Sequence, residues 1–327
     1  MQLYIEHNKK LYFPSVLDEV KWTTERKGSP GILNFSVIKD EKIAFEEGDH
    51  VAFQYDGDNV FYGFIFTKKR TKENVIEVTA YDQLRYLKNK DTCMYMNKKA
   101  SEVIKMLAAD FKLQAGTIED TGYVIPSRDE DNQTLFDIIY KALDITFDTT
   151  GKLYTLYDDY GKLSLKNMKN MTLDLLICDE SGEDFDYTSS IDTNTYNKIK
   201  LSYDNEKAGK REVFVDQSGE NMNKWGVLQY YSSVNADSKS NIEEIRAKAK
   251  MMAKVMLKNY NHVTRSLSFK SLFGDTKARA GTSVYVYMNL GDILLKNYML
   301  INKATHTYSK DTHFMDLELI GGGIYGN

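Results

Sequence analysis

Apolar and polar residues alternate over short segments in the first 80 residues of the chain. Segments with this alternation, or with a nearly continuous apolar run, lie at residues 2–6, 32–38, 51–55, 61–66 and 76–80. Turn-forming residues separate them at residues 28–31, 47–49 and 56–59. Because alternation with a period of two is typical of half-buried strands, the pattern predicts short strands arranged as a small barrel or sandwich.

A helical pattern replaces this alternation after residue 82. One helix face carries Ala100, Val103, Ile104, Leu107, Ala108 and Phe111. Asn97 is placed to cap this helix, and a second helix is predicted over residues 133–143. Two Gly-Lys-Leu turns between residues 146 and 165 are flanked by alternation, which predicts a β-meander. Residues 90–175 are therefore predicted to form a separate α+β unit.

The last part of the chain is predicted to begin at an acidic, polar segment, residues 178–198, which we interpret as a domain junction. A long helix is predicted over residues 241–260, with Asn241 and Glu244 at the spacing of a capping box. Met252 and Met256 lie on its apolar side and are candidates for core or interface packing. The other predicted strands are residues 199–203, 212–215, 265–270, 283–288, 298–301 and 314–320.

The first and last β regions resemble each other. A glycine, Gly48 in one and Gly281 in the other, precedes an alternating strand, and two further strands follow at similar spacing. This order predicts two similar β domains joined through the helical insert. We predict domains at 1–88, 89–177 and 178–327. Two such domains per chain would give a trimer six similar units around an axis, and such a ring can stack on a true hexamer.

Composition favours a β-rich protein with much contact surface, because the 327 residues include 23 Tyr and only 3 Pro. The 43 basic and 47 acidic residues are spread along the chain, and no Lys or Arg run is long enough to follow a phosphate backbone. We therefore expect no direct nucleic-acid binding. No stretch of about 18 apolar residues occurs, so no membrane insertion is expected. The chain is expected to be made in the cytoplasm.

Candidate catalytic residues have stronger structural interpretations. Cys93 and Cys178 lie in no nucleophile or metal-binding motif, so we expect reduced, structural cysteines. The adjacent carboxylates Asp158 and Asp159 precede Tyr160-Gly161, which favours a turn over a pair of acids across a cleft. No phosphate-binding, dinucleotide-binding or hydrolase motif occurs.

Candidate metal ligands also have simpler explanations. The acidic residues between 179 and 186 lack the spacing of a calcium loop and are predicted to be a solvated linker. His306 and His313 flank a predicted hairpin turn without an evident third ligand, which favours a structural role. We predict no catalytic, cofactor-binding or metal site, and no enzyme activity.

A strand gives way to a short helix at Tyr81-Asp82. Asp82 is predicted to cap the helix that begins at Gln83 by accepting a backbone N–H near Arg85. Tyr81 and Tyr86 occupy the positions of a hydrophobic staple around the cap. This corner is predicted to lead from the first β domain into the insert.

The same stretch carries a family resemblance. "AYDQLRYL" at 80–87 follows "FEEGDHVAF" at 45–53 and "VFYGFIF" at 60–66. Further matching pieces are "LYDDYGKLSLKNM" at 156–168, "SIDTNTYNKIKL" at 190–201, "KARAGTSVYV" at 277–286 and "ATHTYSKDTHFMDLEL" at 304–319. In this order they resemble the XkdQ/YqbQ-type baseplate hub proteins of defective prophages and contractile phage tails.

The resemblance implies a mainly β chain with two tube-like β-barrel domains and a small α+β insert, forming a homotrimer with a pseudo-sixfold ring. Such a ring adapts the hexameric tail tube to the trimeric central spike in the baseplate of a virion or tail-like particle. The implied partners are the tail tube protein, the spike protein, other baseplate proteins and the tape measure. No catalytic residue is carried over, because the matching motifs are structural.

One alternative of a different class stays open. The chain would then be a tail-associated peptidoglycan hydrolase or cell-wall-binding module, with its activity in residues 90–175 and Asp158 or Asp159 among its carboxylates. Whether the particle carries DNA or is a headless bacteriocin also stays open.

Overall fold

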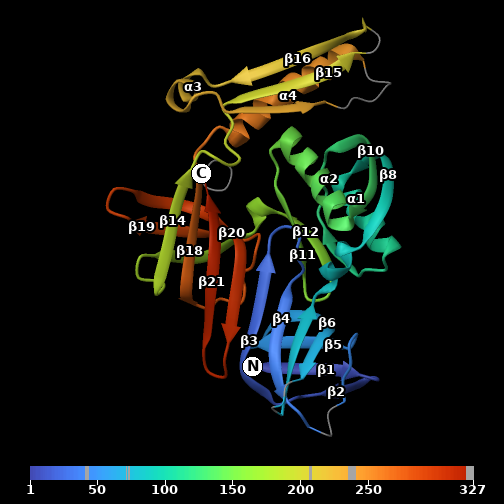
Figure 1. Cartoon of the computed structure of the whole chain (residues 1–327), viewed down its shortest axis with the longest axis vertical. Coiled ribbons are helices and arrows are strands. Elements are labelled where there is room, and N and C mark those ends of the chain that lie inside the picture. The colour runs from blue at the N-terminus through green and yellow to red at the C-terminus, as the bar shows by residue number, and fades with distance from the viewer. Residues whose placement is uncertain (41–43, 71, 73, 206–207, 235–240, 322–327) are drawn as a thin grey trace.

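Two β units lie edge to edge, and two units that contain the longer helices lie beside and beyond them (Figure 1). The computed structural model describes residues 1–40, 44–70, 72, 74–205, 208–234 and 241–321. The fold is mainly β, as predicted. None of the helices in these ranges has the length and apolar character needed to cross a membrane.

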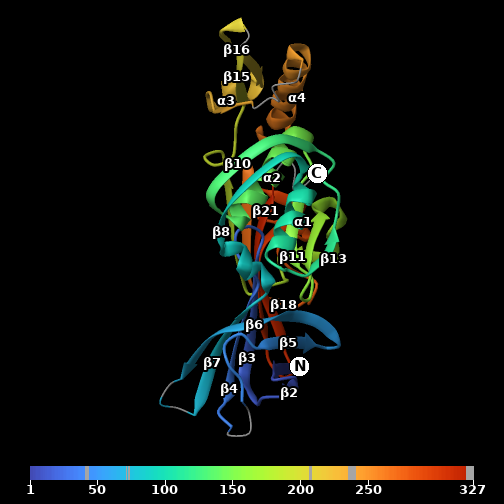
Figure 2. The same ribbon diagram turned by 90° about the vertical axis from the view of Figure 1, so that its right-hand side faces the viewer.

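The first β unit has a core between two layers of strands. Its strands are β1 (Gln2–His7), β2 (Lys10–Tyr12), β3 (Val16–Glu25), β4 (Ile32–Ile38), β5 (His50–Tyr55), β6 (Asp58–Arg70) and β7 (Val75–Tyr81). The long strand β6 pairs with β5 through its first half and with β7 through its second half. Figure 2 shows β4 and β7 on one side of the unit and β5 on the other. The five strands predicted from alternation are confirmed.

The second β unit repeats this arrangement. Its strands are β13 (Thr172–Cys178), β14 (Asp184–Ser190), β18 (Thr264–Phe273), β19 (Ser283–Asn289), β20 (Leu294–Tyr308) and β21 (His313–Gly321). The hydrogen-bonded order β14-β18-β21-β20-β19 matches β3-β4-β7-β6-β5 strand for strand. The long strand β20 takes the place of β6.

The two predicted glycines occupy equivalent positions in the two β units. The Gly48 N–H donates to the Ile65 carbonyl, and the Ile65 N–H donates to the Asp49 carbonyl. The same pair of bonds joins Gly281 and Thr282 to Ile301. Each long strand has a register shift directly after its isoleucine. Gly48 has φ +96° and Gly281 has φ +94°, a region that favours glycine.

The two β units join through antiparallel pairing of β20 with β3, which includes His306 opposite Trp22 and Tyr308 opposite Val20. The joined strands form one sheet of 13 strands, and Tyr308 lies in the core of the first β unit. The predicted closed barrels are not found in the described part of the chain. The strand order is open, because β14 and the second half of β6 each pair on one side only.

The insert packs two helices on strands. It comprises η1 (Gln83–Lys88), β8 (Lys90–Lys99), α1 (Ala100–Asp110), β9 (Ala115–Ile118), β10 (Val124–Thr134), α2 (Leu135–Thr150), β11 (Tyr154–Asp158), β12 (Leu163–Asn167) and η2 (Met168–Asn170). The predicted cap at Asn97 is wrong, because Asn97 lies within β8 and α1 begins after Lys99. The predicted meander is a single hairpin, β11-β12, because α2 continues to Thr150.

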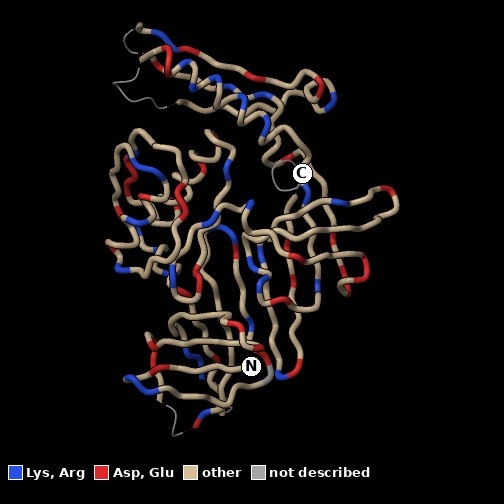
Figure 3. The backbone as a smooth tube through the Cα atoms, turned by 180° about the vertical axis from the view of Figure 1, so that it is seen from behind, with Lys and Arg blue, Asp and Glu red and all other residues tan. Residues whose placement is uncertain are grey.

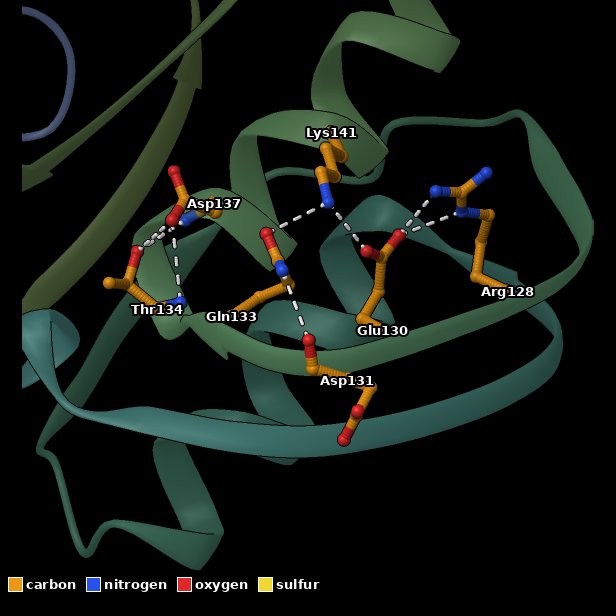
Figure 4. Close-up of polar contacts among 7 residues, drawn as sticks. All are labelled: Arg128, Glu130, Asp131, Gln133, Thr134, Asp137 and Lys141. Carbon is orange, nitrogen blue, oxygen red and sulfur yellow. Dashed lines mark hydrogen bonds and ion pairs between the residues drawn. The ribbon is translucent and has the colours of Figure 1, made fainter.

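A buried carboxylate ties the edge of the insert to its second helix (Figure 4). Glu130 on β10 is 2% exposed and accepts hydrogen bonds from Arg128 and from Lys141 on α2. Burial raises the pKa of Glu130, but the two cations outweigh it and hold the pKa below its usual range. Thr134 caps α2 by accepting the Asp137 N–H at 3.1 Å. These contacts fix α2 against the β8-β10 ribbon.

The long helix belongs to a unit of its own, called here the α4 unit. It contains β15 (Lys198–Asn205), β16 (Lys210–Gln217), α3 (Gly219–Trp225), β17 (Gln229–Ser233) and α4 (Ile242–Tyr260). Met256 is buried against Ile199 and Leu201, and Met252 packs at the edge of the same cluster. The prediction that this helix forms part of the second β domain is therefore wrong, because its apolar face packs on the β15-β16-β17 sheet instead.

The acidic segment predicted as a linker contains a strand. Residues 184–190 form β14, which pairs with β18 along its whole length. The alternation was not visible, because most side chains of β14 are exposed on this isolated chain. The α4 unit follows β14 and joins it to β18, at the position where the first β unit has only the short loop of residues 26–31.

The equivalent glycines give a matched test of the repeat. An added Cβ at Gly48 meets no atom within 4 Å, whereas one at Gly281 would lie 2.3 Å from the Thr155 side chain. We expect Gly48→Ala to cost about 1 kcal/mol of unfolding free energy through backbone strain. Gly281→Ala adds steric overlap and should cost about 3 kcal/mol. Urea unfolding of the two variants checks the difference, and equal losses would contradict the packing at Gly281.

Candidate functional site

The first β unit, the second β unit and the insert meet at the loop of residues 275–282, called here the junction loop. The Ala280 N–H donates to Thr24 Oγ1 of the first β unit at 3.0 Å. Arg279 Nη1 donates to the Asp158 carbonyl of the insert at 2.9 Å. Gly281 pairs with Ile301 in the second β unit. The loop therefore fixes the relative positions of all three parts.

Arg279 is the central side chain of this junction. Its guanidinium carbon lies 4.4 Å from the centre of the Tyr157 ring and 5.8 Å from that of Trp22, and its Nε is sealed from solvent. Burial lowers the pKa of Arg279, and the nearby charges of Asp158 and Asp82 oppose this shift. Sequence reasoning missed Arg279. The available signal was a single arginine between two alanines before Gly281.

Asp82 is buried beside this junction and holds two backbone segments. It caps η1 as predicted: its Oδ1 accepts the Leu84 N–H at 3.0 Å, so the donor is one residue before Arg85. Its Oδ2 accepts the Gly31 N–H at 2.8 Å, a contact that sequence reasoning missed. An added Cβ at Gly31 would lie 2.4 Å from Asp82, so this approach requires glycine. The pKa of Asp82 is raised well above its usual range, mainly by burial and to a smaller extent by the nearby charge of Asp158.

Tyr81 and Tyr86 lie on either side of this cap, and each contacts Phe66 on β6. The ring centres are 5.3 Å apart for Tyr81 and Phe66, and 6.0 Å apart for Phe66 and Tyr86. The ring of Phe66 thus connects the two tyrosines. Their predicted interface role stays a prediction.

Asp158 serves the turn that the sequence predicted. Its Oδ1 accepts the Gly161 N–H at 2.7 Å, and its Oδ2 accepts Nε2 of Gln83 at 3.0 Å. Burial raises the pKa of Asp158 to about 6, although both hydrogen bonds oppose the shift. The residue as a whole is only 6% exposed. A carboxylate held in this way connects the β11-β12 hairpin to η1 and has little access to a polymeric substrate.

His306 and His313 are brought together, with Nδ1 of His306 lying 2.8 Å from Nε2 of His313. Nε2 of His306 donates to the Ala278 carbonyl in the junction loop, because a carbonyl can only accept. Nδ1 of His306 therefore accepts a hydrogen bond from His313. Both ring nitrogens of His306 are occupied, so the geometry favours the structural role over metal binding. Burial lowers the pKa of His306 to about 3 and that of His313 to about 4.

The remaining candidates do not form a site with this junction. Cys93 is buried in the insert, and Cys178 lies 3.3 Å from the Ser181 hydroxyl. Among the described residues, His7, Glu46 and Asp49 place three possible ligand atoms within 4.8 Å of one another. His7 and Asp49 are already paired at 2.8 Å, and the Glu46 N–H donates to Asp49. These contacts account for the cluster without an ion.

Comparison with known proteins identifies close sequence relatives. The model of a family described as YQBQ-like matches residues 20–320. The uncharacterized protein YqbQ of Bacillus subtilis (strain 168) is 32% identical over 314 residues, which are 93% of this chain and 92% of that protein. The phage-like element PBSX protein XkdQ of the same strain is 31% identical over 279 residues, covering 84% and 82% of the two chains.

Solved structures share the fold at low sequence identity. A tail protein from Neisseria meningitidis MC58 has a TM-score of 0.66 at 13% identity and covers 99% of this chain and 97% of its own. An E. coli component of the type VI secretion system, described as structurally similar to the bacteriophage T4 tail proteins gp27 and gp5, has a TM-score of 0.56 at 11% identity. It covers 100% of this chain and 79% of its own.

Removing the junction cation should destabilise the fold. We expect Arg279→Met to lower the unfolding free energy by about 2 kcal/mol at pH 8, because the charges of Asp82 and Asp158 then lose their compensating cation. The loss should shrink at pH 5, where Asp158, with a pKa of about 6, is largely protonated. Chemical denaturation at both pH values measures the effect. Lys277→Met, at an exposed position of the same loop, is the control, and an Arg279→Met loss independent of pH would contradict this account.

The histidine pair should make stability depend on pH. The pKa of each ring is lower in the folded chain than its ordinary value of 6.5, so the stabilisation is present above pH 6.5 and is lost as pH falls toward 4. His313→Gln keeps an N–H donor and removes one titrating ring. Between pH 7 and pH 5 the unfolding free energy of this variant should fall by about 1 kcal/mol less than that of the parent, after allowance for the partial solvent exposure of His313.

Denaturation midpoints at pH 7, 6 and 5 give this difference. Asp158, whose raised pKa acts in the opposite direction, is present in both proteins and cancels from the comparison. Equal pH dependence in parent and variant would contradict the neutral histidine pair.

Proposed function

The chain belongs to the YQBQ-like family, and we propose on this basis that it is a structural component of a phage-type tail. The proposed role is that of a baseplate hub, a homotrimer that joins the hexameric tail tube to the trimeric central spike. XkdQ is named as a protein of a phage-like element, and the structure of similar fold from N. meningitidis is named as a tail protein. These names support the proposal for a chain of the same family and fold.

One observation carries the proposal: the contact between the two β units can be repeated between subunits. Within the chain, β20 of the second unit pairs with β3 of the first. By strand order, β6 is equivalent to β20, and β14 is equivalent to β3. Residues 67–70 of β6 pair with β7 on one side only, so their other edge, like the outer edge of β14, has no backbone partner in the described part of the chain. Pairing β6 of one subunit with β14 of the next would repeat the internal contact around a ring.

The matching registers define this pairing. Lys303 lies opposite Glu25 and Thr305 lies opposite Thr23 in the internal contact. The equivalent residues are Thr67 and Lys69 on β6, and Ser190 and Thr188 on β14. Thr67 should therefore lie opposite Ser190 of the next subunit, and Lys69 opposite Thr188.

Charge is complementary along the same two edges. The end of β6 carries exposed Lys69 and Arg70, and β14 carries exposed Asp184 and Asp186. In antiparallel pairing the acidic end of β14 would extend past the basic end of β6. Opposite charges across paired strands stabilise the contact, and exposed charges keep an unpaired edge from aggregating.

The face shared by the joined strands suits the lining of a channel. Ion pairs cross it between neighbouring strands, at Lys69–Glu77, Lys303–Glu25 and Lys270–Asp316. Thr23 and Thr305 are hydrogen-bonded at the joint between the two units. Figure 3 shows acidic and basic residues interspersed over the chain. A polar lining of mixed charge would let a polymer pass without binding it tightly.

The proposed partners follow from the ring. Six similar β units would face the tail tube. The parts in which the two units of each chain differ occur three times in the ring, and these would face the spike, other baseplate proteins and the tape measure. The particle baseplate is the proposed location. We also propose that the chain is not an enzyme, supported by the buried, hydrogen-bonded state of Asp158 and Glu130.

Cysteine cross-linking tests the ring. In the variant Thr67→Cys with Ser190→Cys, the two thiols should face each other across the proposed subunit contact, at a spacing that permits a disulfide. Oxidation should give covalent trimers on a non-reducing gel, and light scattering should give the mass of three chains. The variant Thr67→Cys with Ser189→Cys is the control, since neighbouring strand residues point to opposite faces.

Cross-linked trimers only in the first variant would support the register. Monomers in both variants under all conditions of assembly, or equal cross-linking in both, would overturn the proposed contact.

A further inference from the structure

The outer faces of the two β units carry equivalent rows of side chains, and only one row is covered. In the first unit the row runs across β1, β5 and β6 as Tyr4, Ala52 and Tyr62. In the second unit it runs across β13, β19 and β20 as Leu176, Tyr285 and Tyr298. The strand registers make Ala52 equivalent to Tyr285, and Tyr62 equivalent to Tyr298.

The row on the first unit is covered by the tip of the β11-β12 hairpin. The Tyr160 ring centre lies 5.6 Å from that of Tyr62, and the Tyr160 hydroxyl lies 3.4 Å from the Tyr4 hydroxyl. Gly161 approaches so closely that an added Cβ would lie 2.6 Å from the Tyr62 ring. Both tip residues have positive φ, which makes the turn tight. Ala52, in the middle of the row, is completely buried.

The row on the second unit is exposed at both ends, and Tyr285 in its middle is half-buried. Leu176 is 57% exposed and Tyr298 is 42% exposed, and Tyr287, the next outward residue on β19, is 44% exposed. Tyr285 and Tyr298 contact each other edge to face at 5.1 Å. Neighbouring exposed apolar side chains of this size mark interaction surfaces. Tyrosine is suited to such a surface, because its ring can be buried while its hydroxyl bonds to a partner.

This exposed row continues a contact that the chain already makes. The insert reaches the same face at Ser283, whose N–H donates to the Met171 carbonyl, and at Gly281, which packs on Thr155. Ser283 precedes Tyr285 by two residues on β19, so coverage ends directly beside the row. The hairpin tip that covers the equivalent row is already used on the first unit, in this copy and in every other copy.

We propose that the row of Leu176, Tyr285 and Tyr298, with Tyr287, docks a tight β-turn from a different protein of the same particle. The first unit defines the chemistry of the occupant: a hairpin tip with an aromatic residue beside a glycine. A ring of three subunits would offer three such sites on its outer side, alternating with three rows covered by the insert. The inference rests on the proposed function for the identity of the particle, but the surface itself is seen on the single chain.

Site-specific photocross-linking in the assembled particle tests this proposal. Tyr298 is replaced by p-benzoylphenylalanine, with Lys166, an exposed residue on β12 of the insert, replaced in the same way as the control. Particles are purified and irradiated, and the cross-linked peptides are identified by mass spectrometry. We expect the Tyr298 probe to join a turn of another particle protein, and the Lys166 probe to give at least tenfold less of that product.

The double variant Leu176→Ser with Tyr298→Ser then tests affinity. Both side chains are exposed, so the thermal midpoint of the chain should change little. Binding of the identified partner, purified and titrated against the chain, should weaken roughly tenfold or more.

Each other outcome overturns the proposal. Cross-links from Tyr298 to a second copy of this chain would assign the surface to self-association. A Tyr298 probe that stays unreacted in particles that contain the chain would show an open surface. Particles that lack the chain would instead contradict the proposed function, so the two failures are distinguishable.

Discussion

Backbone pairing between β3 and β20 is the contact on which the architecture depends. An unpaired strand edge presents a row of donors and acceptors that must find partners in water or in another strand. Here the edge of one β unit meets the edge of its near copy, with six residue pairs from Lys303–Glu25 to Tyr308–Val20. The contact also joins the cores of the two units, because the ring centre of Tyr308 in the second unit lies 5.0 Å from that of Phe53 in the first. Two strand edges equivalent to those in this contact stay unpaired within the described part of the chain: the outer edge of β14, which corresponds to β3, and that of residues 67–70 of β6, which corresponds to β20.

The junction loop makes this joint rigid at an electrostatic cost. Arg279, Asp82 and Asp158 are largely buried, and water would solvate their charges better than the protein does. Their compensation is geometric: Asp82 holds Gly31 and Leu84, Asp158 holds Gly161 and Gln83, and Arg279 crosses from the second unit to the insert. Buried polar groups of this kind fix a relative orientation more strongly than apolar packing alone, since each hydrogen bond has a direction. A subunit that must close a ring needs a fixed angle between its units.

The sequence predicted the features that local pattern determines. Strands with one buried face, such as β4 and β7, were found from their alternation, and α2 and α4 from their apolar stripes. Strands β8, β10 and β14 were missed, because exposed side chains outnumber buried ones in each and hide the alternation. Asp82 was found as a cap because its partner Leu84 is two residues away. Its bond to Gly31 and the Arg279–Asp158 contact were not found, because 51 and 121 residues separate the partners.

The two β units keep the same pairing and differ in what covers them. Gly48 and Gly281, each with the residue that follows it, make the same two backbone bonds, but only Gly281 packs against the insert. Tyr62 lies under the hairpin tip at Gly161, whereas its equivalent Tyr298 is exposed to solvent. The α4 unit extends one connection, and the equivalent connection of the first unit is a short loop. Pairing strength depends on backbone geometry, so it permits a ring of near-equal units. Recognition of a partner depends on side chains. Because the two β units differ in their side chains, a ring with sixfold contacts on one surface can make threefold contacts on another.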